Sequence, residues 1–336
     1  MANKVTVRQI AEKLGISMMT VSRALNNLPN VDPKTRELVI SAAHEMGYVP
    51  NHIAKSLVQN KTYTIGVVVP EITHSFFPEV IRGIEETANL KNYQIILTHS
   101  AEDAVKEVDA IQTLLSKRVD GILISTAESV KDTSIYKTIM KMGIPLVFYD
   151  RCVPGLGASC VRIDDVKCST QITEYLVSKG YRKIAHLSGP SSVSIGRDRL
   201  EGFIKALENN SINVSDNYIV EAGFHEAGGY KAMKTLLMLP ASERPDAIVA
   251  VNDPAAFGAM KAINEEGYKI PDDFAIVGIS DDIRAELMTP PLTTLKQPAY
   301  LVGKKAAKKL INHIEDKNEE VEDILIDTEL IVRSTT

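Results

Sequence analysis

The sequence predicts an α/β protein with a small helical head followed by a larger body of doubly wound sheets. Two observations predict this architecture. The first sixty residues contain three helical patterns separated by turn-forming residues, and from Thr64 onward the chain repeats a short apolar strand, a turn and an amphipathic helix. The strands are apolar throughout instead of alternating with polar residues, which is typical of parallel strands that are covered on both faces.

The first helix of the head is predicted from the spacing of its capping residues. Thr6 and Gln9 have the spacing of a capping box, in which each side chain satisfies a free backbone donor of the first turn. Gly15 can adopt the left-handed conformation that ends a helix. A helix is therefore expected from Val7 to Leu14.

Two more helices follow in the head. Ser17 is a candidate N-cap for a second helix from Met18 to Leu25, only about three residues after the first. Asp32 followed by Pro33 predicts the start of a third helix that runs to Gly47. Three helices with a tight, glycine-containing first turn match the helix-turn-helix plan, whose second helix enters the major groove of DNA. From the spacing alone, the alternative to DNA binding is a small helical subdomain that binds no partner.

The charge is divided unequally along the chain. The whole sequence has a net charge of −5, which by itself disfavours a nucleic-acid partner. Residues 1–60 contain seven Lys/Arg and four Asp/Glu, a net of +3, so residues 61–336 have a net of −8. A basic head on an acidic body is compatible with DNA binding by the head alone.

Seven strands are predicted in the body, each short and apolar. A sheet of the doubly wound type is expected because helical patterns with spacings of three and four lie between them. About 275 residues in this part of the chain are enough for two lobes. The predicted strands are Thr64–Val69, Gln94–Leu97, Gly121–Ser125, Leu146–Tyr149, Ile184–Leu187, Ala247–Val251 and Phe274–Val277.

Several segments are similar to one family, in order and in spacing. In the head these are VTVRQIAEKLGISMMTVSRALN from Val5 to Asn26, VDPKTR at 31–36 and GYVPNHIAKSL at 47–57. In the body they are VFYDR at 147–151, LSGP at 187–190, RDRLEGF at 197–203, AVND at 250–253 and PPLTTLKQP at 290–298. With these motifs the whole chain resembles the LacI/GalR family of bacterial transcription regulators.

The resemblance implies a domain plan. It places a helix-turn-helix DNA-binding domain at residues 1–50 and a hinge helix with its linker at 51–61. A two-lobed, periplasmic-binding-protein-like sensor follows, with crossings between the lobes near Arg162, Pro291 and Val321. The N-terminal lobe is then formed by 62–162 with 291–321, and the C-terminal lobe by 163–290 with 322–336.

The resemblance also implies a function. It predicts a sequence-specific transcriptional regulator, in the first place a repressor, that binds a pseudo-palindromic double-stranded operator as a homodimer. In this arrangement Arg23 is a candidate for a bidentate contact to guanine, whereas a methionine thioether cannot donate to a base edge. Leu57 would wedge into the minor groove. The predicted DNA-binding residues are Thr6, Ser17, Met18, Met19, Thr20, Ser22, Arg23, Asn26, Asn51, Ala54, Lys55 and Leu57.

A small-molecule effector is expected between the lobes, because ligands of open α/β sheets bind beyond the carboxyl ends of the strands. Carboxylate, amide and guanidinium groups with aromatic walls suit a sugar or a related polar metabolite. Ser280 stands where the family has an aspartate, and Asp281 is expected to compensate. The resemblance implies that Asp150, Arg199, Asn252 and Gln297 are polar effector contacts and that Phe77 and Phe224 are the aromatic walls. Arg151, Ser280 and Asp281 are added to the predicted effector-binding residues because they directly follow strands.

Several residues in and beside the predicted cleft also have an ordinary structural interpretation. Asp253, which is followed by Pro254, fits the cap of a helix better than a ligand contact. Arg199 is compatible with a surface position, and Phe77 with the apolar core. The second class of function is a cytoplasmic solute-binding protein or a doubly wound enzyme without DNA binding; the helix-turn-helix segment counts against both.

Motifs of catalysis and of cofactor binding are missing from the sequence. It contains neither the phosphate-binding G-x-x-x-x-G-K-[ST] loop nor the G-x-S-x-G nucleophile elbow, and Gly155-Leu-Gly157 lacks the third glycine of a dinucleotide site. The seven histidines are scattered without i, i+4 pairs, although His225 could line the cleft. We therefore expect no enzymatic activity, no cofactor and no metal.

Location and redox state are predicted from composition. The sequence has no apolar run of roughly 18 residues that could span a membrane, and its first residues do not resemble a signal peptide, so the protein is expected in the cytoplasm. Cys152, Cys160 and Cys168 lie at equal spacings of eight, which suits neither a disulfide framework nor a zinc site. They are expected to be reduced thiols.

Overall fold

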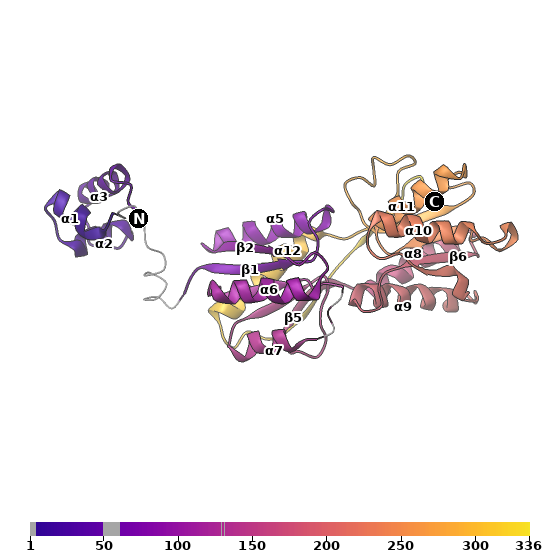
Figure 1. The fold of residues 1–336 in the computed structure, drawn as a ribbon, viewed down its shortest axis with the longest axis horizontal. Helices are drawn as coiled ribbons and strands as arrows, with labels where there is room; N and C mark the ends of the chain where they lie inside the picture. Colours follow the sequence, from indigo (N-terminus) through magenta and orange to yellow (C-terminus); the bar gives the residue numbers. More distant parts are fainter. Residues whose placement is uncertain (1–4, 50–60, 129, 131) are drawn as a thin grey trace. The chain divides into compact units, whose positions relative to one another are not determined.

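The chain divides into two compact units in the computed structural model, Met1–Thr62 and Tyr63–Thr336, here called the head and the body. The structure describes residues 5–49, 61–128, 130 and 132–336. Figure 1 shows the elements of each unit. Among the described residues, none of the helices combines the length and the apolar character needed to cross a membrane.

The head contains three helices where the sequence predicts them, although the third ends at Glu45 and not at the predicted Gly47. They are α1 (Val7–Leu14), α2 (Met18–Leu25) and α3 (Pro33–Glu45). Thr6 and Gln9 form the predicted capping box, and Gly15 ends α1 with a φ of 65°. The three helices share a core in which Ile10, Val21 and Val39 are fully buried.

The first lobe of the body is built on a six-stranded sheet in the order β11-β5-β4-β3-β1-β2, with all strand pairs parallel. Its strands are β1 (Thr64–Val69), β2 (Gln94–His99), β3 (Gly121–Ile124), β4 (Leu146–Tyr149), β5 (Ser159–Ile163) and β11 (Asp323–Ile326). Its helices are α5 (Phe76–Leu90), α6 (Ala104–Ser116), α7 (Ser134–Lys141) and α12 (Ala299–Glu315).

The second lobe has another six-stranded sheet, in the order β12-β10-β9-β8-β6-β7, in which only the β10–β12 pair is antiparallel. Its strands are β6 (Ile184–Ser188), β7 (Ile219–Glu221), β8 (Ala247–Ala250), β9 (Ala275–Ser280), β10 (Thr293–Lys296) and β12 (Glu329–Ile331). Its helices are α8 (Asp165–Ser178), α9 (Ser194–Asn209), α10 (Glu226–Leu237) and α11 (Asp253–Glu265), with 3₁₀ turns at Asp216–Tyr218 and Ala241–Glu243.

Both faces of each sheet are covered by helices, as the apolar strands predict. Along β1, Ile65, Val67 and Val69 belong to one buried cluster with residues of α5 and α12, whereas Val68 belongs to another with residues of α6 and α7. This alternation follows from the period of two along a strand. The α/β architecture and all seven predicted strands are therefore confirmed, with boundaries that differ by up to two or three residues.

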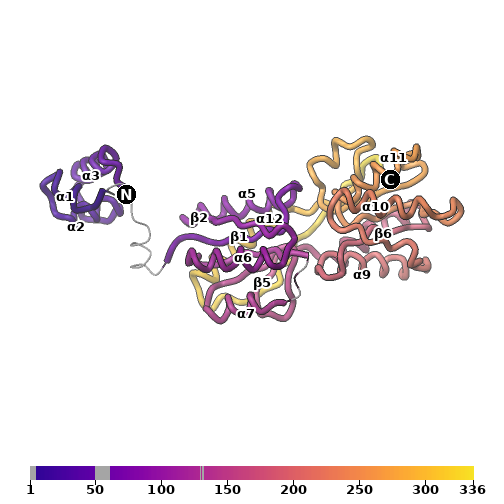
Figure 2. Tube along the Cα trace, viewed as in Figure 1, coloured from indigo at the N-terminus to yellow at the C-terminus, as the bar shows by residue number. Residues whose placement is uncertain are grey.

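The chain passes between the lobes three times, and Figure 2 follows these passages along the trace. The first lies after β5, close to the predicted Arg162. The second and third are placed too early by the sequence, at Pro291 and Val321: β10 still belongs to the second sheet and β11 to the first. These crossings therefore follow Lys296 and Ile326, and the lobe boundaries shift with them.

Close contact between α5 and α12 depends on glycines. The two helices lie side by side (Figure 1). A Cβ on Gly303 would lie 2.0 Å from the Val80 carbonyl oxygen, and one on Gly83 would lie 2.2 Å from the Tyr300 carbonyl oxygen. Only hydrogen side chains fit at these two positions without moving a backbone.

The cysteines differ from expectation. Cys152 and Cys160 form a disulfide, with Cα atoms 6.1 Å apart, and Cys168 is a free, buried thiol. The sequence spacing did not reveal this pair because the tertiary fold forms it: Cys160 lies in β5 beside β4, and the turn after β4 brings Cys152 back toward it. The expectation of three reduced thiols is wrong for two of them.

Candidate functional site

The first candidate surface is the outer side of α2 in the head. Met18 and Met19, which open this helix, are 55% and 67% exposed, in keeping with a surface role instead of core packing. The opposite side of the helix packs inward through Val21 and Ala24. Thr20 is half-buried, and the other predicted contact residues described in the head are exposed: Thr6, Ser17, Ser22, Arg23 and Asn26.

Local hydrogen bonds fix both ends of α2. The Ser17 hydroxyl oxygen accepts the Thr20 backbone N–H at 3.1 Å, and at the other end the Asn26 side-chain amide donates to the Ser22 carbonyl at 2.8 Å. Ser17 leaves other N–H groups of the first turn facing outward, where a phosphate oxygen can bind them. The predicted hinge contacts Asn51, Ala54, Lys55 and Leu57 lie outside the described residues.

The second candidate site is a cleft in the body, between the two lobes at the carboxyl ends of their strands. The empty space between its lining residues, with open solvent counted, is about 530 Å³. Of the nine effector-binding residues predicted from the sequence, eight line this cleft although they come from distant parts of the chain. These eight are Phe77, Asp150, Arg151, Arg199, Phe224, Asn252, Ser280 and Gln297.

Asp150 and Gln297 meet in the floor of the cleft. Asp150 follows β4 with a φ of 59°, a left-handed conformation that Asp tolerates better than most residues. Its carboxylate accepts a hydrogen bond of 2.8 Å from the Gln297 amide. Burial raises the pKa of the Asp150 carboxyl above its ordinary value. The pair therefore offers a polar ligand a carboxylate acceptor and a side-chain amide whose positions are already fixed by their hydrogen bond.

Arg151 is only 3% exposed and lies among aromatic rings and a carboxylate. Its guanidinium carbon is 4.6 Å from the centre of the Phe224 ring and 5.9 Å from that of Phe77. One terminal nitrogen donates to Glu102 at 2.7 Å and to the Thr126 carbonyl at 3.2 Å. The Arg151 Nε atom is buried without a hydrogen-bond partner, so it is a donor that an acceptor on a ligand could satisfy.

Arg199 is not a surface residue, since it is 2% exposed. Its Nε donates to Asp165 at 2.7 Å and one terminal nitrogen to the Val251 carbonyl at 2.6 Å. Burial raises the pKa of the Asp165 carboxyl to about 6 against the opposing effect of Arg199, so Asp165 is ionised at neutral pH. Arg199 therefore balances a buried negative charge beside the cleft.

The N-cap role expected of Asp253 belongs to its neighbour Asn252, which also lines the cleft as predicted. Asn252 is the N-cap of α11: its side-chain oxygen accepts from the Ala255 backbone N–H, and its amide donates to the Phe224 carbonyl. Asp253 is fully buried, where it accepts from the Thr294 hydroxyl at 2.6 Å and the Asp282 backbone N–H at 2.8 Å. Burial raises the pKa of the Asp253 carboxyl to about 7.

Asp281 is the predicted residue that the structure does not bring to the cleft. It forms an ion pair of 2.7 Å with Arg333, and Asp282 lines the cleft in its place. The shift follows from the backbone after β9, where Ser280 has a φ of 137° and Asp281 a φ of 56°. These two positive φ angles change which of the successive side chains faces the cleft. Residue types alone do not reveal such a change.

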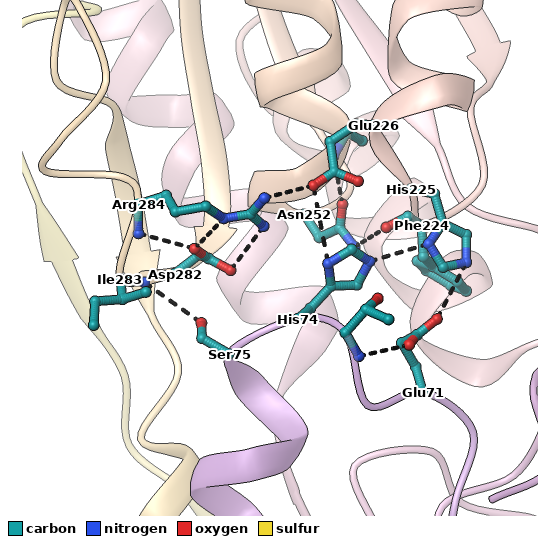
Figure 3. A network of polar contacts seen from close by, with 12 residues as sticks. Glu71, His74, Ser75, Phe224, His225, Glu226, Asn252, Asp282, Ile283 and Arg284 are labelled. Carbon is teal, nitrogen blue, oxygen red and sulfur yellow. Dashed lines mark hydrogen bonds and ion pairs between the residues drawn. The ribbon is translucent and has the colours of Figure 1, made fainter.

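Other residues of the cleft were missed by the sequence analysis. Glu71 and His74 follow β1, and Glu102 follows β2, so their position beyond strand ends is the sequence signal that marks all three. His225 directly precedes α10 and also lines the cleft. Figure 3 shows that Glu71, His74 and His225 belong to one polar network.

The arrangement suits binding of a polar ligand. Buried acceptors, amide and guanidinium groups converge on one space, with the rings of Phe77 and Phe224 beside them. Such groups can orient several hydroxyls, and aromatic rings can cover apolar faces of a ligand.

Both units match family models. Residues 6–51 match the model described as bacterial regulatory proteins, lacI family, and residues 62–334 match periplasmic binding proteins and sugar binding domain of LacI family.

Full-length relatives match along nearly the whole chain. The transcriptional repressor CytR of Escherichia coli is 33% identical over 98% of this chain and 96% of its own length. The ribose operon repressor of Halalkalibacterium halodurans is 34% identical over 98% of this chain and 97% of its own. The lac repressor dimer bound to operator and the anti-inducer ONPF has a TM-score of 0.88, with 27% identity and 99% of both chains covered.

Proposed function

The chain belongs to the LacI family of bacterial transcriptional regulators, and we propose that its head and hinge bind a pseudo-palindromic operator as a homodimer while its cleft binds the controlling metabolite. It is a DNA-binding regulator of the repressor type, as its relatives are. Two copies related by a two-fold axis match the two half-sites of such an operator.

The exposed side of α2 supports the role of the head in reading DNA. Arg23 offers a fork of donors that matches guanine O6 and N7, and Ser17, Thr20 and Ser22 offer hydroxyls to phosphate oxygens. Met18 and Met19 offer only apolar surface, which suits thymine methyl groups. The operator is therefore expected to differ from those of relatives that place hydrogen-bonding residues there.

The cleft supports a sugar or a related polar metabolite as the effector. Eight predicted residues from separate segments converge on it, and this convergence is the observation that carries the proposal. One relative is named for ribose and another was solved with ONPF, which is compatible with this ligand class. A ligand that contacts both lobes would alter their arrangement and so change operator affinity by about 1–3 kcal/mol.

Two further parts of the proposal concern chemistry and location. Neither the motifs nor the described cleft suggests a nucleophile with an activating base, and we propose binding without catalysis and without a cofactor. The relatives are regulators, not enzymes. A regulator of operator DNA works in the bacterial cytoplasm, where we place the protein.

Selection from fragments of the source genome tests the DNA-binding half. Full-length protein should enrich a pseudo-palindromic site, and its affinity for that site should fall steeply with salt. Arg23→Ala should weaken binding to this site by about 1–3 kcal/mol. Arg8→Ala is the matched control, because Arg8 is an exposed arginine of the same unit, paired with Glu12, outside the predicted contacts. A folded dimer that enriches no sequence would overturn the proposal.

A thermal-shift screen tests the effector half. Sugars, sugar acids, sugar phosphates and nucleosides should be compared, because a ligand that binds only the folded state raises its melting temperature. A ligand found in this way should lose its effect in Asp150→Asn, a change that retains a residue tolerant of the left-handed backbone. An unchanged response in that variant would place the ligand elsewhere.

A further inference from the structure

Two histidines from different lobes meet at the cleft. His74 lies between β1 and α5 in the first lobe, and His225 directly precedes α10 in the second. The His74 Nε2 and His225 Nδ1 atoms are 3.0 Å apart, although 151 residues separate them in the chain. Glu71, also from the first lobe, places its Oε2 atom 3.8 Å from His225 Nε2 (Figure 3).

We propose that Glu71, His74 and His225 form a binding site for a divalent transition-metal ion, with Zn²⁺ the best match, that joins the two lobes. One ligand atom from each of the three residues lies within 4.8 Å of the others. Donors at about 2.0–2.1 Å around a tetrahedral zinc ion lie roughly 3.4 Å from one another, so small side-chain adjustments are enough. Two imidazoles and a carboxylate are a common ligand set for Zn²⁺, and a water molecule can complete it.

The neighbouring groups already hold the carboxylate in place. The Glu71 Oε1 atom accepts the backbone N–H groups of Ile72 and Thr73 at 2.6 and 2.7 Å, which leaves Oε2 facing His225. Glu71 is mostly buried, with 14% of its side chain exposed. A half-buried carboxylate with one oxygen fixed and the other beside an imidazole is arranged as a ligand instead of a fully solvated surface charge.

A second carboxylate, that of Glu226, lies near the Nδ1 atom of His74. The His74 Nδ1 atom is buried without a hydrogen-bond partner, and the nearest acidic oxygen, on Glu226, is 3.9 Å away. Arg284 holds Glu226 at 2.7 Å and is itself held by Asp282. Histidines that bind a metal through one nitrogen usually donate from the other to a carboxylate. A small movement of His74 on metal binding would complete such a pair.

A metal ion at this point would favour contact between the lobes. Two of its ligands belong to the first lobe and one to the second, so all three can bind together only when the lobes meet. Binding to one arrangement alone shifts the population toward it. This site does not depend on the proposed DNA binding or on the identity of the effector, since its ligands are residues of the chain alone.

Titration of full-length protein with ZnCl₂ in a calorimeter tests the site, with neither DNA nor effector present. The wild type should bind one ion per chain in a step that His74→Ala and His225→Ala each abolish. His99→Ala is the matched control, because His99 is an exposed histidine on β2, and it should leave that step unchanged. Equal stoichiometry and affinity in all four proteins would overturn the proposal.

Two further measurements keep the result interpretable. His74→Gln retains a polar side chain of similar size and should also lose the metal-binding step. Urea unfolding of this variant without metal should match that of the wild type, which would show that the variant has lost a metal ligand and not its fold. Co²⁺ in place of Zn²⁺ should give visible absorption without a thiolate charge-transfer band. A thiolate band, or metal binding retained by His74→Gln, would assign the metal to other residues and contradict the site.

Discussion

At the scale of single residues, the cleft contains several charges that burial makes costly. Asp150, Arg151, Asp165, Arg199 and Asp253 are all almost fully buried. Each keeps at least one specific partner, because an unpaired charge in a protein interior costs several kcal/mol. These residues therefore stabilise the local fold as well as shaping the binding space, and substitutions among them report on both.

Replacement of Arg199 by alanine should destabilise the protein itself. The change would leave the Asp165 carboxylate buried without its partner, and breaking a buried pair in this way typically costs about 3–5 kcal/mol. Urea unfolding measures the loss. Arg197→Ala, at an exposed arginine of the same helix, should change stability by less than about 0.5 kcal/mol. Equal stability of the two variants would show that the Arg199–Asp165 pair contributes nothing.

Asp253 should make stability depend on pH. Its pKa is raised from 3.8 to about 7 by burial, so between these values the folded chain retains a proton that the unfolded chain has lost. Its contribution to the free energy of unfolding therefore falls as pH rises through that window and levels off above it. The stability of the wild type relative to Asp253→Asn should fall by about 2 kcal/mol from pH 5 to pH 7.

Urea unfolding at several pH values checks this slope, and the difference between two proteins cancels the other titrating groups. Asp216→Asn is the control, because Asp216 is exposed. Its difference from the wild type should stay constant across the same range. Parallel curves for the wild type and Asp253→Asn would contradict a buried, protonated Asp253.

Residue types at strand ends, together with the family resemblance, predicted half of the residues that line the cleft but not its details. Polar residues after strand ends were found because the carboxyl edge of a parallel sheet collects them. The exchange between Asp281 and Asp282 was missed because it depends on two positive φ angles. Arg199 was predicted for the cleft, with a surface position as the alternative, and it lies there almost fully buried. Residue type alone does not decide between these two positions, because an arginine in a helix is compatible with both.

At the scale of elements, the helices and the continuously apolar strands were predictable and the other strands were not. The missed strands have three to five residues, such as Ile219–Glu221 and Glu329–Ile331, and several are half-exposed or contain threonine and lysine. Such segments lack the continuous apolar run of the others. Their pairing with distant strands, which decides where the chain crosses between lobes, is a tertiary property.

The contact between α5 and α12 gives an element-scale prediction. Gly303→Ala would place a methyl group 2.0 Å from the Val80 carbonyl oxygen, so one helix backbone must move. Overpacking of this kind costs about 1–3 kcal/mol, and because the neighbour is backbone the upper part of this range is expected. Thermal or urea unfolding measures it. Lys305→Ala on the exposed side of α12 is the control, and a Gly303→Ala protein as stable as that control would show that the helices can separate freely.

At the scale of the whole molecule, the body brings together residues that the sequence keeps far apart. Ser75 accepts the Ile283 backbone N–H at 3.4 Å, and the Ser192 hydroxyl donates to the Glu128 carbonyl at 2.9 Å, so contacts between the lobes surround the cleft. A ligand or a metal ion there acts on the same arrangement of lobes. The chain passes between the lobes three times, so a movement of one lobe relative to the other must change the conformation of these three connecting segments.

The central claim is that ligand binding in the cleft controls operator affinity. The measurement is fluorescence anisotropy of the enriched operator with full-length protein at fixed salt, with and without the ligand found by thermal shift. The dissociation constant should change by about 5-fold to 150-fold, and operator should change the ligand's affinity by the same factor. Asp150→Asn should bind operator normally and lose the change. A ligand that binds the cleft but leaves operator affinity unaltered would contradict the account.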